Sequence, residues 1–100
     1  MVYYYIKESK KIMKIKEGFV VRKIAGDTVV VPIGKNIDSM NGTIVLNDTA
    51  AFMWEQLQTE TSAEEITERL LTEYDVLPEK AAADTEKFLS VLREHSILEV

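Results

Sequence analysis

The segment from residue 46 to residue 57 constrains the fold most, because it joins a strand end, a capped turn and an amphipathic helix in immediate succession. Asn47 is suited to accept a backbone N–H bond as the helix N-cap, and Asp48 places a negative charge beside the positive end of the helix. Three apolar residues then recur at i, i+4 and i+7 and define one helix face: Ala50, Trp54 and Leu57. These features predict a scaffold and carry no chemistry of their own.

Three short β-rich runs are arranged around tight turns before this helix. Residues 19–24 and 28–33 are rich in β-branched side chains, and the Gly26-Asp27 pair between them is a tight-hairpin signature. A polar loop over residues 34–42 ends in Asn-Gly and leads into a third strand at 43–46. The short connections predict an antiparallel meander.

The rest of the chain is predicted to be helical. A first helix covers about residues 48–58, and Ser62 with Glu65 forms a capping box for the second. Pro78 suits the first position of the third helix. Two apolar stripes are expected to be buried, the first on helix two and the second on helix three: Ile66, Leu70 and Tyr74, and Ala81, Thr85, Phe88 and Leu92. Residues 97 and 98 lie beyond the third helix and are expected to tuck under the fold.

The length of 100 residues predicts one domain, and 46% apolar residues suffice for one small core. Residues 1–13 are interpreted as an N-terminal extension and residues 14–100 as the domain. The chain has no cysteine, which excludes disulfides and thiolate catalysis. It also has no secretory signal and no apolar run of membrane-spanning length, so a cytoplasmic location is expected.

The polar inventory argues against an enzyme. His95 is the only histidine and lies at a predicted helix end, where it is expected to interact with the helix dipole. No glycine-rich phosphate loop is present. Glu64, Glu65 and Glu68 share one helix and are expected to face solvent. We therefore expect no catalytic residue, no cofactor and no metal.

The third predicted strand has an unguarded edge. Residues 43–46 contain neither charge nor proline, whereas the first strand contains Arg22 and Lys23. Such an edge can accept an extended peptide as an added strand. The alternative is that the third helix or the N-terminal extension covers it, and the residues alone leave both open.

Residues 13–100 resemble the PqqD family, which is named for a small protein of pyrroloquinoline quinone biosynthesis. The resembling segments are GFVVR (18–22), LNDTAAFMWE (46–55), EYDV (73–76) and ADTEKFL (83–89). The resemblance implies an α+β, winged helix-turn-helix-like fold with a three-stranded antiparallel sheet followed by three helices. It also implies a non-catalytic recognition element that binds the leader of a ribosomally made precursor peptide and presents it to a modifying enzyme, often a radical S-adenosylmethionine enzyme.

In that family the leader lies as an extra strand against the third strand, beside the third helix. Carried over to this sequence, the peptide-binding residues are Thr43, Ile44, Val45 and Leu46 on the strand, and Asp84, Lys87, Phe88 and Val91 on the helix. Two residues depart from the family pattern. Leu77 stands where a polar N-cap of the third helix is common, and Ser96 stands where a glycine often ends it.

Three alternatives remain at this point. The first is a winged-helix DNA-binding regulator, but the net charge of −5 and the acidic second half disfavour nucleic acid. The second is a structural accessory subunit that stabilises an enzyme without touching its substrate. The third concerns oligomeric state, a homodimer or domain-swapped oligomer formed through the N-terminal extension.

Overall fold

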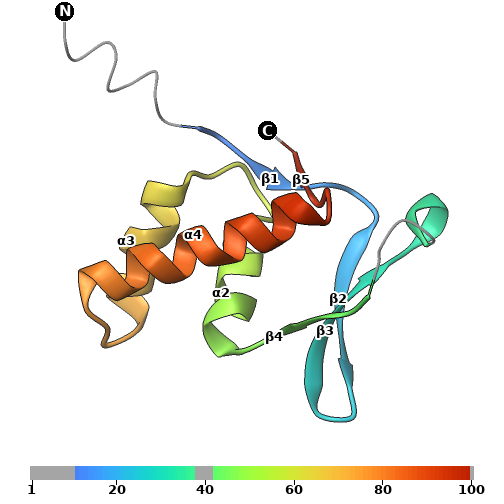
Figure 1. The fold of residues 1–100 in the computed structure, drawn as a ribbon, viewed down its shortest axis with the longest axis horizontal. Coiled ribbons are helices and arrows are strands. Elements are labelled where there is room, and N and C mark those ends of the chain that lie inside the picture. Colours follow the sequence, from blue (N-terminus) through green and yellow to red (C-terminus); the bar gives the residue numbers. More distant parts are fainter. Residues whose placement is uncertain (1–10, 38–41, 100) are drawn as a thin grey trace, which may run out of the picture.

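The computed structural model describes residues 11–37 and 42–99. An antiparallel three-stranded sheet comes first and three α-helices follow it (Figure 1), which confirms the predicted α+β class. The sheet has the strand order β2-β3-β4, with β2 at Phe19–Ile24, β3 at Asp27–Pro32 and β4 at Ile44–Leu46. The helices are α2 (Asp48–Gln56), α3 (Ala63–Glu73) and α4 (Pro78–Glu94), and the short 3-10 helix η1 spans Gly34–Asn36.

The β2–β3 hairpin turns one residue earlier than the sequence predicts. Ile24 is paired with Asp27, so Ala25 and Gly26 form a two-residue loop. Both loop residues have positive φ, 51° at Ala25 and 88° at Gly26. A type I′ turn requires this, and its twist matches that of the strands it joins. Asp27 is therefore the first residue of β3 and not part of the turn. In the loop after β3, Asn41 of the predicted Asn-Gly turn lies outside the described residues.

A second, two-stranded sheet that the sequence did not predict joins the two ends of the domain. Strand β1 (Lys14–Ile15) pairs antiparallel with β5 (Leu98–Glu99), and Figure 1 shows the two strands side by side near the C-terminal end of α4. Met13 extends this contact by exchanging backbone hydrogen bonds with Thr61 at 2.8 and 3.0 Å. Residues of the predicted extension other than 11–13 lie outside the described residues.

The predicted helix starts are present. The Asn47 side chain accepts the Ala50 N–H at 2.9 Å. Ser62 Oγ accepts the Glu65 N–H at 3.3 Å, and the Ser62 hydroxyl donates to the Glu65 carboxylate. This last bond differs from the predicted capping box, in which the glutamate binds the N-cap backbone N–H. Pro78 begins α4 after residue 77, whose side chain gives no cap bond.

The core lies between the sheet and the three helices. Ile66 and Leu70 of the first predicted stripe are buried and Tyr74 is half-buried, while all four residues of the second stripe are buried. Ile97 and Leu98 are buried as predicted. No helix within residues 11–37 and 42–99 is long and apolar enough to cross a membrane.

Candidate functional site

Strand β4 is an edge of the sheet. Within the described residues it pairs with β3 only, in the register Thr28 to Leu46, Val29 to Val45 and Val30 to Ile44. A strand at an edge presents backbone N–H and C=O groups that no neighbouring strand satisfies. The hydrogen-bonding pattern of the sheet determines which residue of β4 presents them.

That pattern is fixed at the open end of the β2–β3 hairpin. Ile33 N–H donates to the Gly18 carbonyl at 2.8 Å. The next pair, Phe19 with Pro32, cannot exchange two bonds because proline has no N–H. Bonded and non-bonded pairs alternate along an antiparallel ladder. The odd-numbered residues of β3 therefore bond to β2, and the even-numbered ones direct their backbone groups toward β4.

The same alternation carries over to β4. Thr28 and Val30 are the even-numbered residues of β3, and their partners are Leu46 and Ile44. These two residues of β4 therefore bond inward to β3. Val45 lies between them, so its N–H and C=O point to the outer edge. Its side chain is 56% exposed, whereas the side chains on either side are buried.

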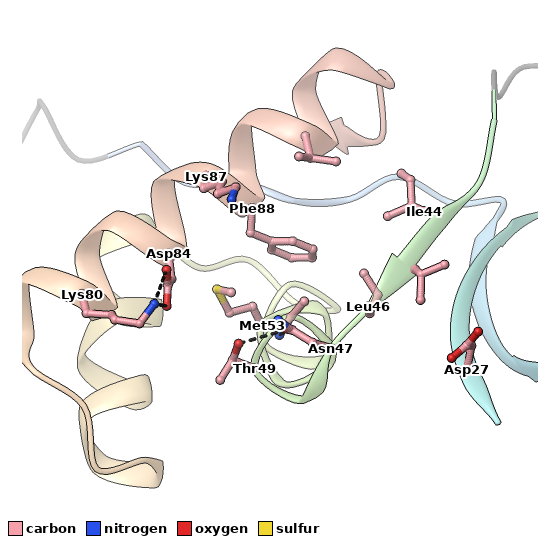
Figure 2. Close-up of a pocket in the computed structure, with 13 residues that line it drawn as sticks. Asp27, Ile44, Leu46, Asn47, Thr49, Met53, Lys80, Asp84, Lys87 and Phe88 are labelled. Carbon is pink, nitrogen blue, oxygen red and sulfur yellow. Dashed lines mark hydrogen bonds and ion pairs between the residues drawn. The ribbon is translucent and has the colours of Figure 1, made fainter.

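A groove of about 640 Å³ runs along this edge, between β4 and α4, with the first turns of α2 at its base. Figure 2 shows Phe88 pointing from α4 toward β4, with Met53 of α2 beneath it. The residues that line the groove are Ile44, Val45, Leu46, Asn47, Thr49, Ala50, Met53, Lys80, Asp84, Lys87, Phe88 and Val91, together with Asp27 of β3.

The centre of the groove is apolar. Ile44, Leu46 and Phe88 are all less than a tenth exposed, and Met53 is buried beneath them. Each also belongs to the main core, so the walls of the groove are held by the same packing that holds the fold. Phe88 therefore belongs both to the core and to the wall of the groove.

Charged side chains lie on the helix wall. Lys80 Nζ and Asp84 Oδ2 form an i,i+4 ion pair at 2.9 Å (Figure 2). Lys87 is exposed, and within the described residues it has no hydrogen bond or ion pair. Lys80 is exposed and Asp84 is half-buried, and the opposite charges of the pair largely cancel each other beyond their immediate surroundings. Lys87 is thus the uncompensated cation of this wall.

The structure brings together seven of the eight residues predicted for peptide binding. Thr43 is the exception: it is exposed, precedes β4 and does not line the groove. Their role in binding stays a prediction. The sequence interpretation missed Lys80, although it lies four residues before Asp84 on the same helix face. It also missed Asp27, whose place depends on the strand register, and the lining residues around the start of α2, among which Asn47 was interpreted as the helix cap and Ala50 as part of the apolar helix face.

His95 lies outside the groove at the C-terminal end of α4, where its Nδ1 is 3.0 Å from the Val91 carbonyl oxygen. This is the helix-end position that the sequence predicts. In residues 11–37 and 42–99 no cluster of His, Cys, Asp and Glu side chains is arranged to hold a metal ion.

A three-stranded meander whose open edge faces a helix across an apolar groove defines a small α+β domain with the geometry of a strand-accepting binding module. Comparison with protein families identifies which one. The family model described as coenzyme PQQ synthesis protein D (PqqD) matches residues 27–98, and the chain belongs to this family. Comparison with curated proteins gives no match.

Solved structures share the fold. TbiB1 in complex with the TbiA(beta) leader peptide is 23% identical with a TM-score of 0.67, over 86% of this chain and 94% of that one. Lasso peptide synthetase B1 complexed with the leader peptide is 22% identical with a TM-score of 0.67, over 88% and 98%. The PqqD truncation of Methylobacterium extorquens PqqCD is described as a stand-alone recognition element for ribosomally synthesized and post-translationally modified peptides (RiPPs). It is 20% identical with a TM-score of 0.65, over 89% of each chain.

Proposed function

We propose that this protein is a non-catalytic recognition element that captures the leader segment of a precursor peptide by strand addition to β4. It then presents that peptide to a modifying enzyme, for which a radical S-adenosylmethionine enzyme is our first candidate. The observation that carries the proposal is the outward-facing N–H and C=O of Val45 at the rim of an apolar groove. An added strand gains backbone hydrogen bonds there and side-chain contacts with α4.

Family and fold support the same function. The chain belongs to the PqqD family, and two proteins of the same fold are described as complexes with leader peptides. Thr43, Ile44, Val45 and Leu46 at and just before β4, of which Thr43 does not line the groove, and the α4 residues Asp84, Lys87, Phe88 and Val91 are proposed to contact the leader. A net charge of −5 makes nucleic acid an unfavourable alternative ligand.

The leader is first identified by recovering the tagged protein from cells that produce it and sequencing the co-purified peptides by mass spectrometry. A synthetic copy of that peptide is then titrated against the purified protein by fluorescence anisotropy. Replacing Val45 with proline removes the outward N–H without touching a bond to β3. Leaving the hydrogen-bond partner of this N–H unsatisfied in the complex costs about 1–3 kcal/mol, so we expect Val45→Pro to weaken binding about fivefold or more.

The matched control is Lys23→Pro. Lys23 is paired with Thr28, and by the alternation above its N–H points to the outer edge of β2, on the opposite side of the sheet. Lys23→Pro should therefore leave the affinity for the leader unchanged. Circular dichroism checks that both variants keep the helices. A folded Val45→Pro protein that binds the leader as tightly as the wild type would exclude strand addition at β4.

A further inference from the structure

We infer that the groove selects an extended segment in which two apolar residues flank one unconstrained residue, with an acidic side chain nearby that reaches Lys87. This inference rests on the proposed function, because it names the peptide that the β4 edge takes. Three features of the groove lead to it. They are the alternation of inward- and outward-directed backbone groups along β4, the apolar walls, and the uncompensated cation on α4.

The direction of the backbone N–H and C=O groups along β4 sets the register of the peptide. Because only Val45 directs both its N–H and its C=O outward within β4, the peptide must centre one residue on it. Residues directly opposite each other in a sheet have side chains on the same face. The central peptide residue therefore projects on the face of the Val45 side chain, which is 56% exposed. That position places no demand on size or polarity.

The two flanking residues project on the other face. This holds for parallel and antiparallel addition alike, since side chains alternate along any strand. They lie level with Ile44 and Leu46 and face the helix wall at Phe88 and Val91. These four side chains carry no hydrogen-bonding group, so a polar residue packed against them would lose water without gaining a partner from them. Both flanking residues should be apolar.

Charge complementarity supplies the third requirement. On the helix wall Lys80 and Asp84 neutralise each other, and Lys87 remains without a partner in the described residues. Lys87 directly precedes Phe88 and lines the groove. A carboxylate on the peptide that reaches it gains an ion pair at the exposed rim of the groove. An acidic residue near the apolar pair is therefore preferred over a basic one.

The test is a phage-displayed library of random linear peptides selected against wild-type protein, Val45→Pro, Lys87→Glu and Arg93→Glu. Arg93 is an exposed cation of the same helix that does not line the groove, so Arg93→Glu controls for the change of net charge. We expect the wild type to enrich peptides with apolar residues two positions apart and an acidic neighbour. Lys87→Glu should keep the apolar spacing but replace acidic neighbours with basic ones, while Arg93→Glu should select like the wild type.

Synthetic versions of an enriched peptide give the magnitudes. Serine at either flanking position should weaken binding about tenfold or more, and serine at the central position should leave it unchanged. Lys87→Glu should weaken binding of the acidic peptide on the order of three- to tenfold.

The outcomes separate this inference from the proposed function. Peptides that depend on Val45 but show no two-residue apolar spacing, or no response to Lys87→Glu, would overturn the inference and leave strand addition standing. Enrichment that Val45→Pro does not affect, or no enrichment at all, would overturn both.

Discussion

At the scale of single residues, Ser96 stands where the family often has a glycine, and this difference lowers the stability of the end of α4. It follows the last turn of α4 with φ of 57°, in the left-handed region. Its N–H donates to the Arg93 carbonyl, and the Ile97 N–H donates to the Leu92 carbonyl at 2.9 Å. These two bonds form a Schellman motif, in which Ser96 holds the position that glycine normally takes.

We therefore expect Ser96→Gly to raise the free energy of unfolding by about 1 kcal/mol, because glycine reaches this backbone conformation without the cost of a Cβ. Urea denaturation followed by circular dichroism measures it. Ser96→Ala is the matched control, since it removes the hydroxyl but keeps the Cβ. An equal gain from alanine would mean that the hydroxyl, and not the backbone conformation, is unfavourable here.

At the scale of secondary-structure elements, the helices were more predictable than the strands at the chain ends. Periodicity, together with the N-caps Asn47 and Ser62 and with Pro78 at the first helical position, indicated the starts of α2, α3 and α4. Strands β1 and β5 are two residues each, which is too short to show any alternation. Their pairing depends on the tertiary approach of the two chain ends and could not be read locally.

The groove likewise has parts that the sequence predicts and parts that it does not. Its β4 side was predictable because an uncharged strand of β-branched and aliphatic residues follows from composition alone. The α4 wall followed from helical spacing together with the family resemblance. The contribution of Asp27 was not accessible, because it requires the register in which Thr28 is paired with Leu46. The outward direction of the Val45 N–H and C=O likewise follows only from the register and from the bond between Ile33 and Gly18.

The β2–β3 hairpin carries its own prediction. Ala25 occupies a type I′ position with φ of 51°, where asparagine is strongly preferred before glycine. Ala25→Asn should raise the free energy of unfolding by roughly 0.5–1 kcal/mol, and Ala25→Val should lower it because β-branched residues tolerate positive φ least. Thermal unfolding of both variants measures the difference. A gain from valine would contradict the turn geometry.

At the scale of the whole molecule, the chain ends close the fold on the side of α4 where β5 emerges. Strand β1 pairs with β5, and Ile15 N–H also donates to the Leu57 carbonyl just after α2. This arrangement ties residues 13–15 to residues 98–99 and to the helical core. The groove that we propose for the leader lies between β4 and α4, whereas β1 and β5 lie near the C-terminal end of α4 (Figure 1).

The position of Met13 bears on where the domain begins. The sequence interpretation assigns it to the extension, yet its side chain is 2% exposed and belongs to the main core. Its backbone exchanges two hydrogen bonds with Thr61. If the domain includes this residue, Met13→Ala should lower the free energy of unfolding by about 2–4 kcal/mol through the cavity it leaves, and Met13→Leu should cost less than about 1.5 kcal/mol.

Chemical denaturation of the three proteins distinguishes the two boundaries. A domain that begins at or before Met13 loses stability with alanine and keeps it with leucine, and the leader affinity of the folded alanine variant stays near that of the wild type because Met13 does not line the groove. Equal stability of all three proteins would return Met13 to the extension. Loss of affinity in a folded Met13→Ala protein would instead mean that chain-end closure positions α4 against β4.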